Sequence, residues 1–176
     1  MIVDDRSFFH GELTRRVSAL MSESVRRTII GYHLDDEGQR VAELSCFHNQ
    51  HLRHRPPFEN RPWVLNDETR GARIGTPIEC TLCFDGELPA VLQHIRSVGP
   101  FDETTIPNRL RALHEIPDGR WGVLRVKEGA TRLVFDQQSL DVLLEAGEER
   151  AIPPTMVHHL EIIGHVNFEI DFLVPG

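Results

Sequence analysis

The feature that most constrains the fold of this chain is the placement of its three cysteines. Cys80 and Cys83 form a C-x-x-C pair, and Cys46 precedes them at the head of a histidine-rich stretch. An odd number of cysteines without a regular framework argues against a disulfide scaffold and indicates reduced thiols that are free to bind a metal. A C-x-x-C turn places two sulfur atoms on one side of a tetrahedral zinc site. The segment around Cys46 would then supply the other side.

The fourth ligand of this predicted zinc site is expected among the histidines that follow Cys46. Side-chain alternation along a strand places His48 on the same side as Cys46 and therefore favours it. His51 has a longer and more flexible spacing and is the alternative. A thioredoxin-like redox pair is less favoured, because no α/β pattern surrounds the C-x-x-C pair. Cysteines without any ligand are a further alternative.

Four polar residues of the same stretch are left over once the zinc ligands are assigned. They are Gln50, Arg53, His54 and Arg55. These residues form either a solvated loop or a recognition surface for an anion or a protein partner. The second alternative is chemically reasonable because the paired N–H donors of an arginine guanidinium match carboxylate and phosphate groups.

The pattern of the chain divides it into three parts. Residues 1–26 have apolar side chains at helical spacing and predict a helical arm. Residues 27–86 contain two β-rich runs around an Asp-Asp-Glu-Gly-Gln turn, then a proline-rich segment, and predict a small zinc-ribbon-like β domain. Residues 87–176 have short β runs separated by turn signals at 127–129, 146–148, 153–154 and 164–165, which are typical of an antiparallel barrel. The expected fold class is mainly β.

Charge and hydropathy limit the partners that such a chain can have. The net charge is −8, and the acidic residues concentrate in the C-terminal half, which disfavours contact with phosphate backbones. No apolar run approaches the roughly 18 to 20 residues that span a bilayer, and Asp4 and Asp5 stand where a secretory signal would be positive. We therefore expect a cytoplasmic protein with no nucleic-acid or membrane partner.

Two resemblances to known families refine these expectations. Residues 27–83 contain the pattern C-x-H-x-Q-H-x-R-H-x-P-P-F, followed by R-P-W and C-x-x-C, and closely resemble a family of small bacterial proteins of unknown function. That resemblance implies no activity. Residues 88–175, with "LRVKEG", "EAGEERAIPP" and "FEIDF", resemble the small cupins of the tellurite-resistance TehB-like and YeaR-like family. This second resemblance implies an antiparallel cupin barrel (a double-stranded β-helix). It also implies a homodimer, formed through cupin sheet edges or the N-terminal helix.

A cupin barrel gathers imidazoles and a carboxylate around a divalent metal such as Zn, Fe, Ni or Mn. The resemblance makes two histidines the first candidates for such a site, and three acidic residues are candidates for a third ligand. They are His114 and His158, and Asp171, Glu161 and Glu115. The isolated histidine His114 departs from the usual H-x-H spacing of cupins. Two buried histidines satisfied by hydrogen bonds are the alternative to a metal.

The place of Asp171 depends on the predicted turn at Gly164 and His165. A two-residue turn there would set His158 directly across from Asp171. One extra residue in the loop would turn Asp171 to the other face of the sheet. The apolar alternation of Phe168, Ile170 and Phe172 is compatible with this second register.

Three functions are compatible with these observations. The first is a cupin that binds a metal or a small molecule, with a structural zinc module, in a bacterial stress response to tellurite, other oxyanions or nitrite. The second is a metal-dependent cupin enzyme of the oxygenase or isomerase class that uses His114 and His158. The third is a non-catalytic partner-binding protein. No nucleophile beside a base and no phosphate-binding loop points to a particular reaction.

Overall fold

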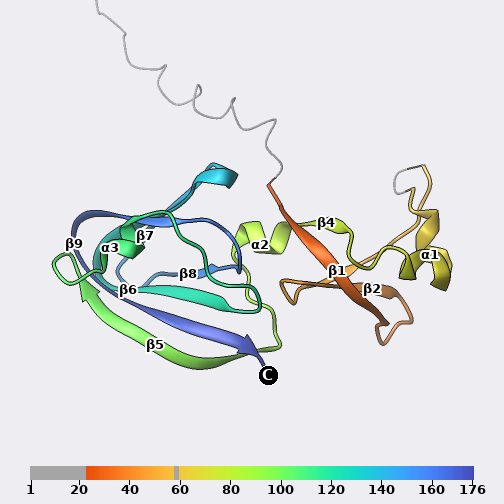
Figure 1. Ribbon diagram of the computed structural model, residues 1–176, viewed down its shortest axis with the longest axis horizontal. Helices are drawn as coiled ribbons and strands as arrows, with labels where there is room; N and C mark the ends of the chain where they lie inside the picture. Colours follow the sequence, from red (N-terminus) through yellow and green to blue (C-terminus); the bar gives the residue numbers. More distant parts are fainter. Residues whose placement is uncertain (1–22, 58–59) are drawn as a thin grey trace, which may run out of the picture.

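The computed structural model describes residues 23–57 and 60–176, which form two antiparallel β sheets joined by a short helix (Figure 1). The predicted fold class is confirmed: the chain is mainly β, with a small Cys/His module followed by a half-barrel sheet. The predicted helical arm lies outside the described residues up to residue 22, and from Val25 the chain already belongs to a strand. Within the described residues, no helix has the length and apolar character needed to cross a membrane.

The first sheet has the strand order β3-β2-β1-β4. Its strands are β1 (Val25–Leu34), β2 (Arg40–Leu44), β3 (Asn49–His51) and β4 (Pro77–Cys80). β1 and β2 form the predicted hairpin. In its turn the Asp35 carboxylate accepts the backbone N–H groups of Glu37 and Gln39, and Gly38 adopts the positive φ of 72° that the turn requires.

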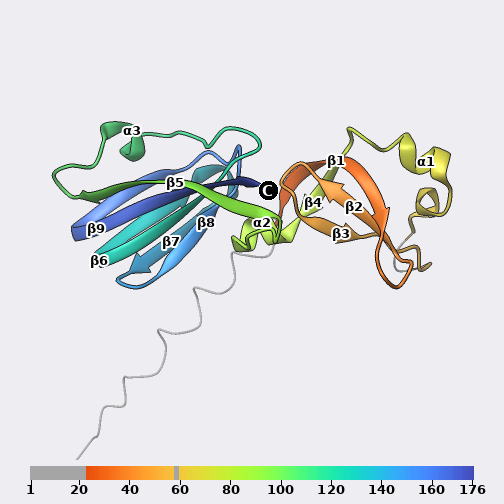
Figure 2. The same ribbon diagram turned by 90° about the horizontal axis from the view of Figure 1, so that it is seen from below.

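Short helices connect and follow this sheet. They are η1 (Pro62–Leu65), α1 (Asp67–Gly71) and α2 (Thr81–Asp85). Asn66 caps α1, because its side-chain oxygen accepts the first free backbone N–H groups of that helix. Gly86 ends α2 in the left-handed conformation. From there the chain enters the second sheet, so α2 lies between the two sheets (Figure 2).

The second sheet has the order β5-β9-β6-β7, and β8 also pairs with β6. Its elements, with two short helices between them, are β5 (Leu92–Asp102), α3 (Asn108–Arg111), β6 (Trp121–Phe135), η2 (Asp136–Gln138), β7 (Leu140–Glu145), β8 (Glu149–Ile152) and β9 (His159–Pro175). The two longest strands, β6 and β9, pair along most of their length and form the centre of the sheet. β5 on one side, and β7 and β8 on the other, are left as edges. The predicted dimerisation through sheet edges stays a prediction.

The predicted turns at residues 127–129 and 164–165 are wrong. β6 and β9 run straight through these positions, and their pairing is interrupted there only by bulges. Gly129 has a φ of 69°, and a Cβ at this position would collide with the carbonyl oxygen of His165. The glycine therefore marks a bulge with a close backbone approach, and such a glycine produces the same sequence signal as a turn.

The core is continuous between the two sheets. Ile29 and Leu44 of the first sheet belong to the same cluster of buried side chains as Trp121, Leu124 and Phe168 of the second. Trp121 is fully buried. Because the two modules share one core, the domain boundaries placed at 26–27 and 86–87 stay a prediction.

Candidate metal centre

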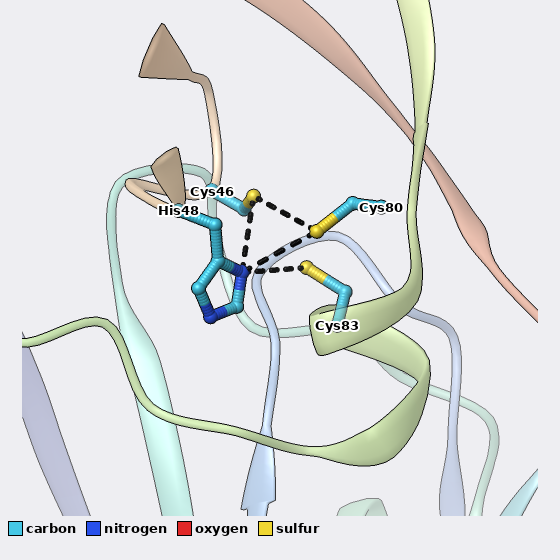
Figure 3. Close-up of side chains that lie close together, drawn as sticks. All are labelled: Cys46, His48, Cys80 and Cys83. Atoms are coloured by element: carbon cyan, nitrogen blue, oxygen red, sulfur yellow. Dashed lines mark hydrogen bonds between the residues drawn. The ribbon is translucent and has the colours of Figure 1, made fainter. Parts of the chain in front are cut away.

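The candidate centre consists of Cys46, His48, Cys80 and Cys83, all of which are buried (Figure 3). Cys46 and His48 lie in the connection between β2 and β3, where the backbone N–H of Phe47 donates to the carbonyl of Leu44. Phe47 has a φ of 69°, so this connection is a tight turn and not a continued strand. The turn, not the predicted strand alternation, sets the two side chains on the same side.

The C-x-x-C pair spans the end of β4 and the first turn of α2. β1 pairs with β2 on one side and with β4 on the other. Cys80 lies opposite Val25, and Ile29 lies opposite Leu44, two residues before Cys46. The sheet therefore brings together two ligand pairs that are far apart in the sequence.

The spacing of the four ligand atoms fits a tetrahedral ion. The Nδ1 atom of His48 lies 3.5, 3.5 and 3.6 Å from the sulfur atoms of Cys46, Cys80 and Cys83, and the sulfurs of Cys46 and Cys80 are 4.0 Å apart. Metal–ligand distances of about 2.3 Å to sulfur and 2.0 to 2.1 Å to nitrogen imply separations of about 3.6 Å for nitrogen–sulfur and 3.8 Å for sulfur–sulfur pairs. This group could hold a metal ion. It is the one such group of three or more ligands in the described part of the chain.

The tautomer of His48 also suits coordination. Its Nε2 lies 3.0 Å from the carbonyl oxygen of Glu87, to which it donates its N–H. In the neutral ring, which is the form that binds a metal, the lone pair then resides on Nδ1, the atom that faces the three sulfurs. The alternative ligand, His51, is exposed and lies elsewhere, with its Nε2 2.9 Å from a carboxylate oxygen of Asp35. The structure therefore brings His48, and not His51, to the cysteines.

The electrostatics of the group favour a bound cation. Burial alone would lower the pKa of His48, but its hydrogen bonds with Cys46 and Cys80 raise the pKa to about 9. Hydrogen bonds with Cys46 and Cys83 lower the pKa of Cys80, whereas hydrogen bonds with the other two thiols and burial raise the pKa of Cys83. Three neighbouring thiolates repel one another unless a positive charge lies between them. A divalent ion provides that charge, because coordinating thiols are deprotonated.

Arg27 is a buried cation beside this group that sequence reasoning missed. Its Nε donates to the sulfur of Cys83 at 3.3 Å, and its Nη1 donates to the carbonyl of Pro154 at 2.9 Å and to the hydroxyl of Thr155 at 3.0 Å. Three thiolates around a divalent ion carry one net negative charge, which the guanidinium balances. The available signal was its position between Val25 and Ile29 in β1, where alternation predicts an inward-facing side chain.

Further contacts tie the centre to the second sheet. The indole N–H of Trp121 donates to the carbonyl of Cys46 at 3.1 Å. The rings of His48 and Trp121 form a T-shaped pair with a centroid distance of 5.4 Å. On β8, the guanidinium of Arg150 donates to the carbonyls of Phe84 and Asp85 at the end of α2, the helix of Cys83. The candidate metal centre therefore lies at the junction of the two modules.

The second predicted metal site is incomplete. His114 and His158 form an isolated β-bridge, and their ring centroids are 4.3 Å apart. The Nδ1 atoms donate to the carbonyls of Ala112 and Met156, at 2.9 and 2.7 Å. In the described residues no acidic residue joins them to make a group of three ligands. The pair therefore agrees with the alternative of two histidines satisfied by hydrogen bonds.

Asp171 is not the third ligand, because the turn that would bring it across from His158 does not exist. Both residues belong to the same extended segment, with His158 directly before β9 and Asp171 near its end. The residue after His158 pairs with Val134 of β6, whereas Asp171 pairs with Val123 near the other end of that strand. The Asp171 carboxylate instead accepts hydrogen bonds from Ser97 and from Arg125.

The remaining candidate ligands and recognition residues are dispersed. Glu161 pairs with Arg132 on β6, and Glu115 is exposed. In the histidine-rich stretch, Arg53 and Arg55 are exposed, and the His54 ring accepts the backbone N–H of Arg61. The side-chain oxygen of Gln50 is buried without a hydrogen-bond partner among the described residues. Recognition by this stretch stays a prediction.

Burial of His158 predicts a specific dependence of stability on pH. Burial lowers the pKa of this residue from 6.5 to about 4, and the hydrogen bond to Met156 opposes the shift. Between these values the unfolded chain binds a proton that the folded chain excludes, so stability falls by about 3 kcal/mol as the pH falls from 6.5 to 4. We expect His158→Gln to remove this part of the pH dependence, measured by urea unfolding at pH 7 and pH 4.

The control for this experiment is His94→Gln, because the His94 side chain is half exposed and lies on β5. The unfolding free energy of His94→Gln should depend on pH as that of the unmodified chain does. Neither substitution is at a residue of the metal centre, so the contribution of the centre cancels when the two variants are compared. If the unfolding free energy changed equally between pH 7 and pH 4 in the two variants, the assignment of this pH dependence to His158 would be contradicted.

Both resemblances drawn from the sequence recur as matches to family models. Residues 30–87 match the model described as protein of unknown function (DUF3565), and residues 96–170 match that of the TehB-like domain. The two predicted family resemblances are confirmed. The TehB-like match begins within β5 and ends within β9, and therefore covers most of the second sheet. The DUF3565 match contains all four residues of the candidate metal centre.

Several solved structures are similar to part of the chain. A protein from E. coli (strain K12) is 26% identical over 51% of this chain and 88% of its own, with a TM-score of 0.48. TehB from Haemophilus influenzae is 15% identical over 49% of this chain, with a TM-score of 0.43, and the match spans 32% of its own length. A cupin-2 domain containing protein from Shewanella frigidimarina is 21% identical over 48% of this chain and 69% of its own, with a TM-score of 0.30. No curated protein matches the chain.

Proposed function

We propose that this chain is a zinc-binding protein whose Cys46, His48, Cys80 and Cys83 hold a structural Zn²⁺ ion at the junction of the two modules. The observation that carries the proposal is the tetrahedral spacing of one nitrogen and three sulfur atoms that are all buried. Catalytic zinc sites keep an open position for water, whereas structural sites fill all four with protein ligands. Four protein ligands in a buried centre correspond to the structural class.

Metal analysis of the purified full-length chain tests this proposal. We expect about one zinc per chain, and we expect His48→Ala to lose most of it, because a Cys₃ site without nitrogen leaves one position open. His51→Ala is the matched control, since His51 contacts Asp35 and not the cysteines. It should retain the metal. A zinc content that is equally reduced in both variants, or that is absent from the unmodified chain, would refute the assignment.

We propose further that the TehB-like half serves a bacterial stress response to tellurite, another oxyanion or nitrite. The support for this role is the match of residues 96–170 to the TehB-like domain model. A strain that lacks the gene should grow less well on tellurite or nitrite, and the unmodified chain should restore growth. Equal growth of the deletion strain under all these conditions would exclude the role. A metal-dependent enzyme centred on His114 and His158 is the less favoured function, because no third ligand joins this pair among the residues 23–57 and 60–176.

A further inference from the structure

A pocket of about 290 Å³ lies in the first module, away from the candidate metal centre. Strands β1 and β2 form one side of it, and α1 forms the other. The polar side chains that line it and bear on its chemistry are Tyr32, Arg40, Asp67 and Arg70. The pocket lies within the part of the chain that matches the family of unknown function.

The hydroxyl of Tyr32 is buried and has no hydrogen-bond partner among the described residues. Tyr32 lines the pocket, and buried polar groups are nearly always paired, so the unpaired hydroxyl of this lining residue indicates a missing partner. Burial raises the pKa of Tyr32, and the positive charges of Arg70 and Arg73 act against that shift. The hydroxyl is therefore a proton donor that stands in a positive field.

Positive charge exceeds negative charge in this pocket. Arg70 is buried, and its guanidinium contacts the carbonyl of Val64 and the carboxylate of Asp67. The Nη1 of Arg40 lies 3.8 Å from the same carboxylate. Asp67 is the one acidic residue of the lining, and its side chain is 89% exposed. Two guanidinium groups thus share a single solvent-exposed carboxylate.

We propose that this pocket binds the oxyanion group, phosphate or carboxylate, of a small molecule. The guanidinium groups of Arg40 and Arg70 pair with the anion, and the Tyr32 hydroxyl donates to it. Arginine forks match the geometry of both anions, and the volume suits a small ligand better than a macromolecule. The exposed Leu34 in the lining offers an apolar contact for the remainder of the ligand. The proposal is independent of the zinc centre.

The proposal is tested by titrating the full-length chain with inorganic phosphate and, separately, with succinate. Amide chemical shifts measured by NMR monitor each titration. We expect shifts at residues of β1, β2 and α1 that saturate in the millimolar range or below for at least one anion. Saturation by phosphate alone or by succinate alone identifies which oxyanion the site prefers. Tyr32→Phe should weaken binding about tenfold, because a hydrogen bond to a charged group is lost. The change removes no hydrogen bond to any residue that the structure describes, so the fold should persist.

Arg40→Gln should weaken binding at least as much as Tyr32→Phe does. Its matched control is Arg26→Gln, which removes the same charge from an exposed position of β1 beside Glu79. That control should bind as the unmodified chain does. If Arg40→Gln and Arg26→Gln bound the anions with equal affinity, general electrostatic attraction would explain the binding, and the proposed site would be wrong. An absence of saturable shifts with both anions would overturn it as well.

Discussion

Cys80→Ser is expected to abolish zinc binding and to lower the melting temperature by about 8–16 °C. An ion present at about a thousand times its dissociation constant stabilises the folded state by about 4 kcal/mol. For a chain of this size, each kcal/mol corresponds to about 2–4 °C. The Cys80 sulfur lies among the other three ligand atoms in a buried group, so serine leaves no replacement for the thiolate. Calorimetry of the purified proteins measures the shift.

Chelation provides a second arm of the same experiment. A strong chelator should lower the melting temperature of the unmodified chain to that of Cys80→Ser. The melting temperature of the variant itself should not change. Thr81→Ser is the control, because Thr81 is exposed and directly follows Cys80. It should melt as the unmodified chain does. A Cys80→Ser variant with an unaltered melting temperature would show that the centre does not stabilise the fold.

Arg27→Met is expected to cost about 3 kcal/mol of unfolding free energy. The guanidinium donates to the Cys83 sulfur, the Pro154 carbonyl and the Thr155 hydroxyl, and therefore connects the metal centre to the second sheet. Methionine fills a similar volume but leaves a thiolate and a carbonyl without their partner, and the loss of one partner of a buried charged pair is costly. Urea unfolding monitored by tryptophan fluorescence measures the effect, because one of the two tryptophans, Trp121, is fully buried at the junction.

The neighbouring residue supplies a matched control. Arg26 is 73% exposed at its side chain and faces Glu79 at 3.7 Å on the surface of the sheet. Arg26→Met should change the unfolding free energy by less than about 1 kcal/mol, because exposed ion pairs contribute little. Equal costs for the two variants would mean that Arg27 does not connect the modules.

Local sequence signals predicted the parts of this molecule that depend on local geometry. The Asp-Asp-Glu-Gly-Gln turn was predictable, because the Asp35 carboxylate and the positive φ of Gly38 act within five residues. The C-x-x-C pair and Cys46 were likewise recognisable as ligand types at zinc-site spacing. His48 was favoured for an incorrect reason, since a turn and not a strand places it beside Cys46.

Features set by distant contacts could not be predicted in the same way. Gly129 and Gly164 produced turn signals, but β6 and β9 continue through them because each strand is held by the other. That pairing also separated Asp171 from His158. The roles of Arg27 and Trp121 depend on contacts across 127 and 75 residues of sequence. No local pattern encodes partners at that separation.

X-ray absorption at the zinc edge of the purified full-length chain tests the central claim most directly. The claim is that one nitrogen and three sulfur atoms hold a zinc ion where the two modules meet. The predicted result is a four-coordinate ion with three sulfur ligands at about 2.3 Å and one nitrogen ligand at about 2.0 Å. A coordination shell composed of nitrogen and oxygen alone, or one with fewer than three sulfurs, would contradict it.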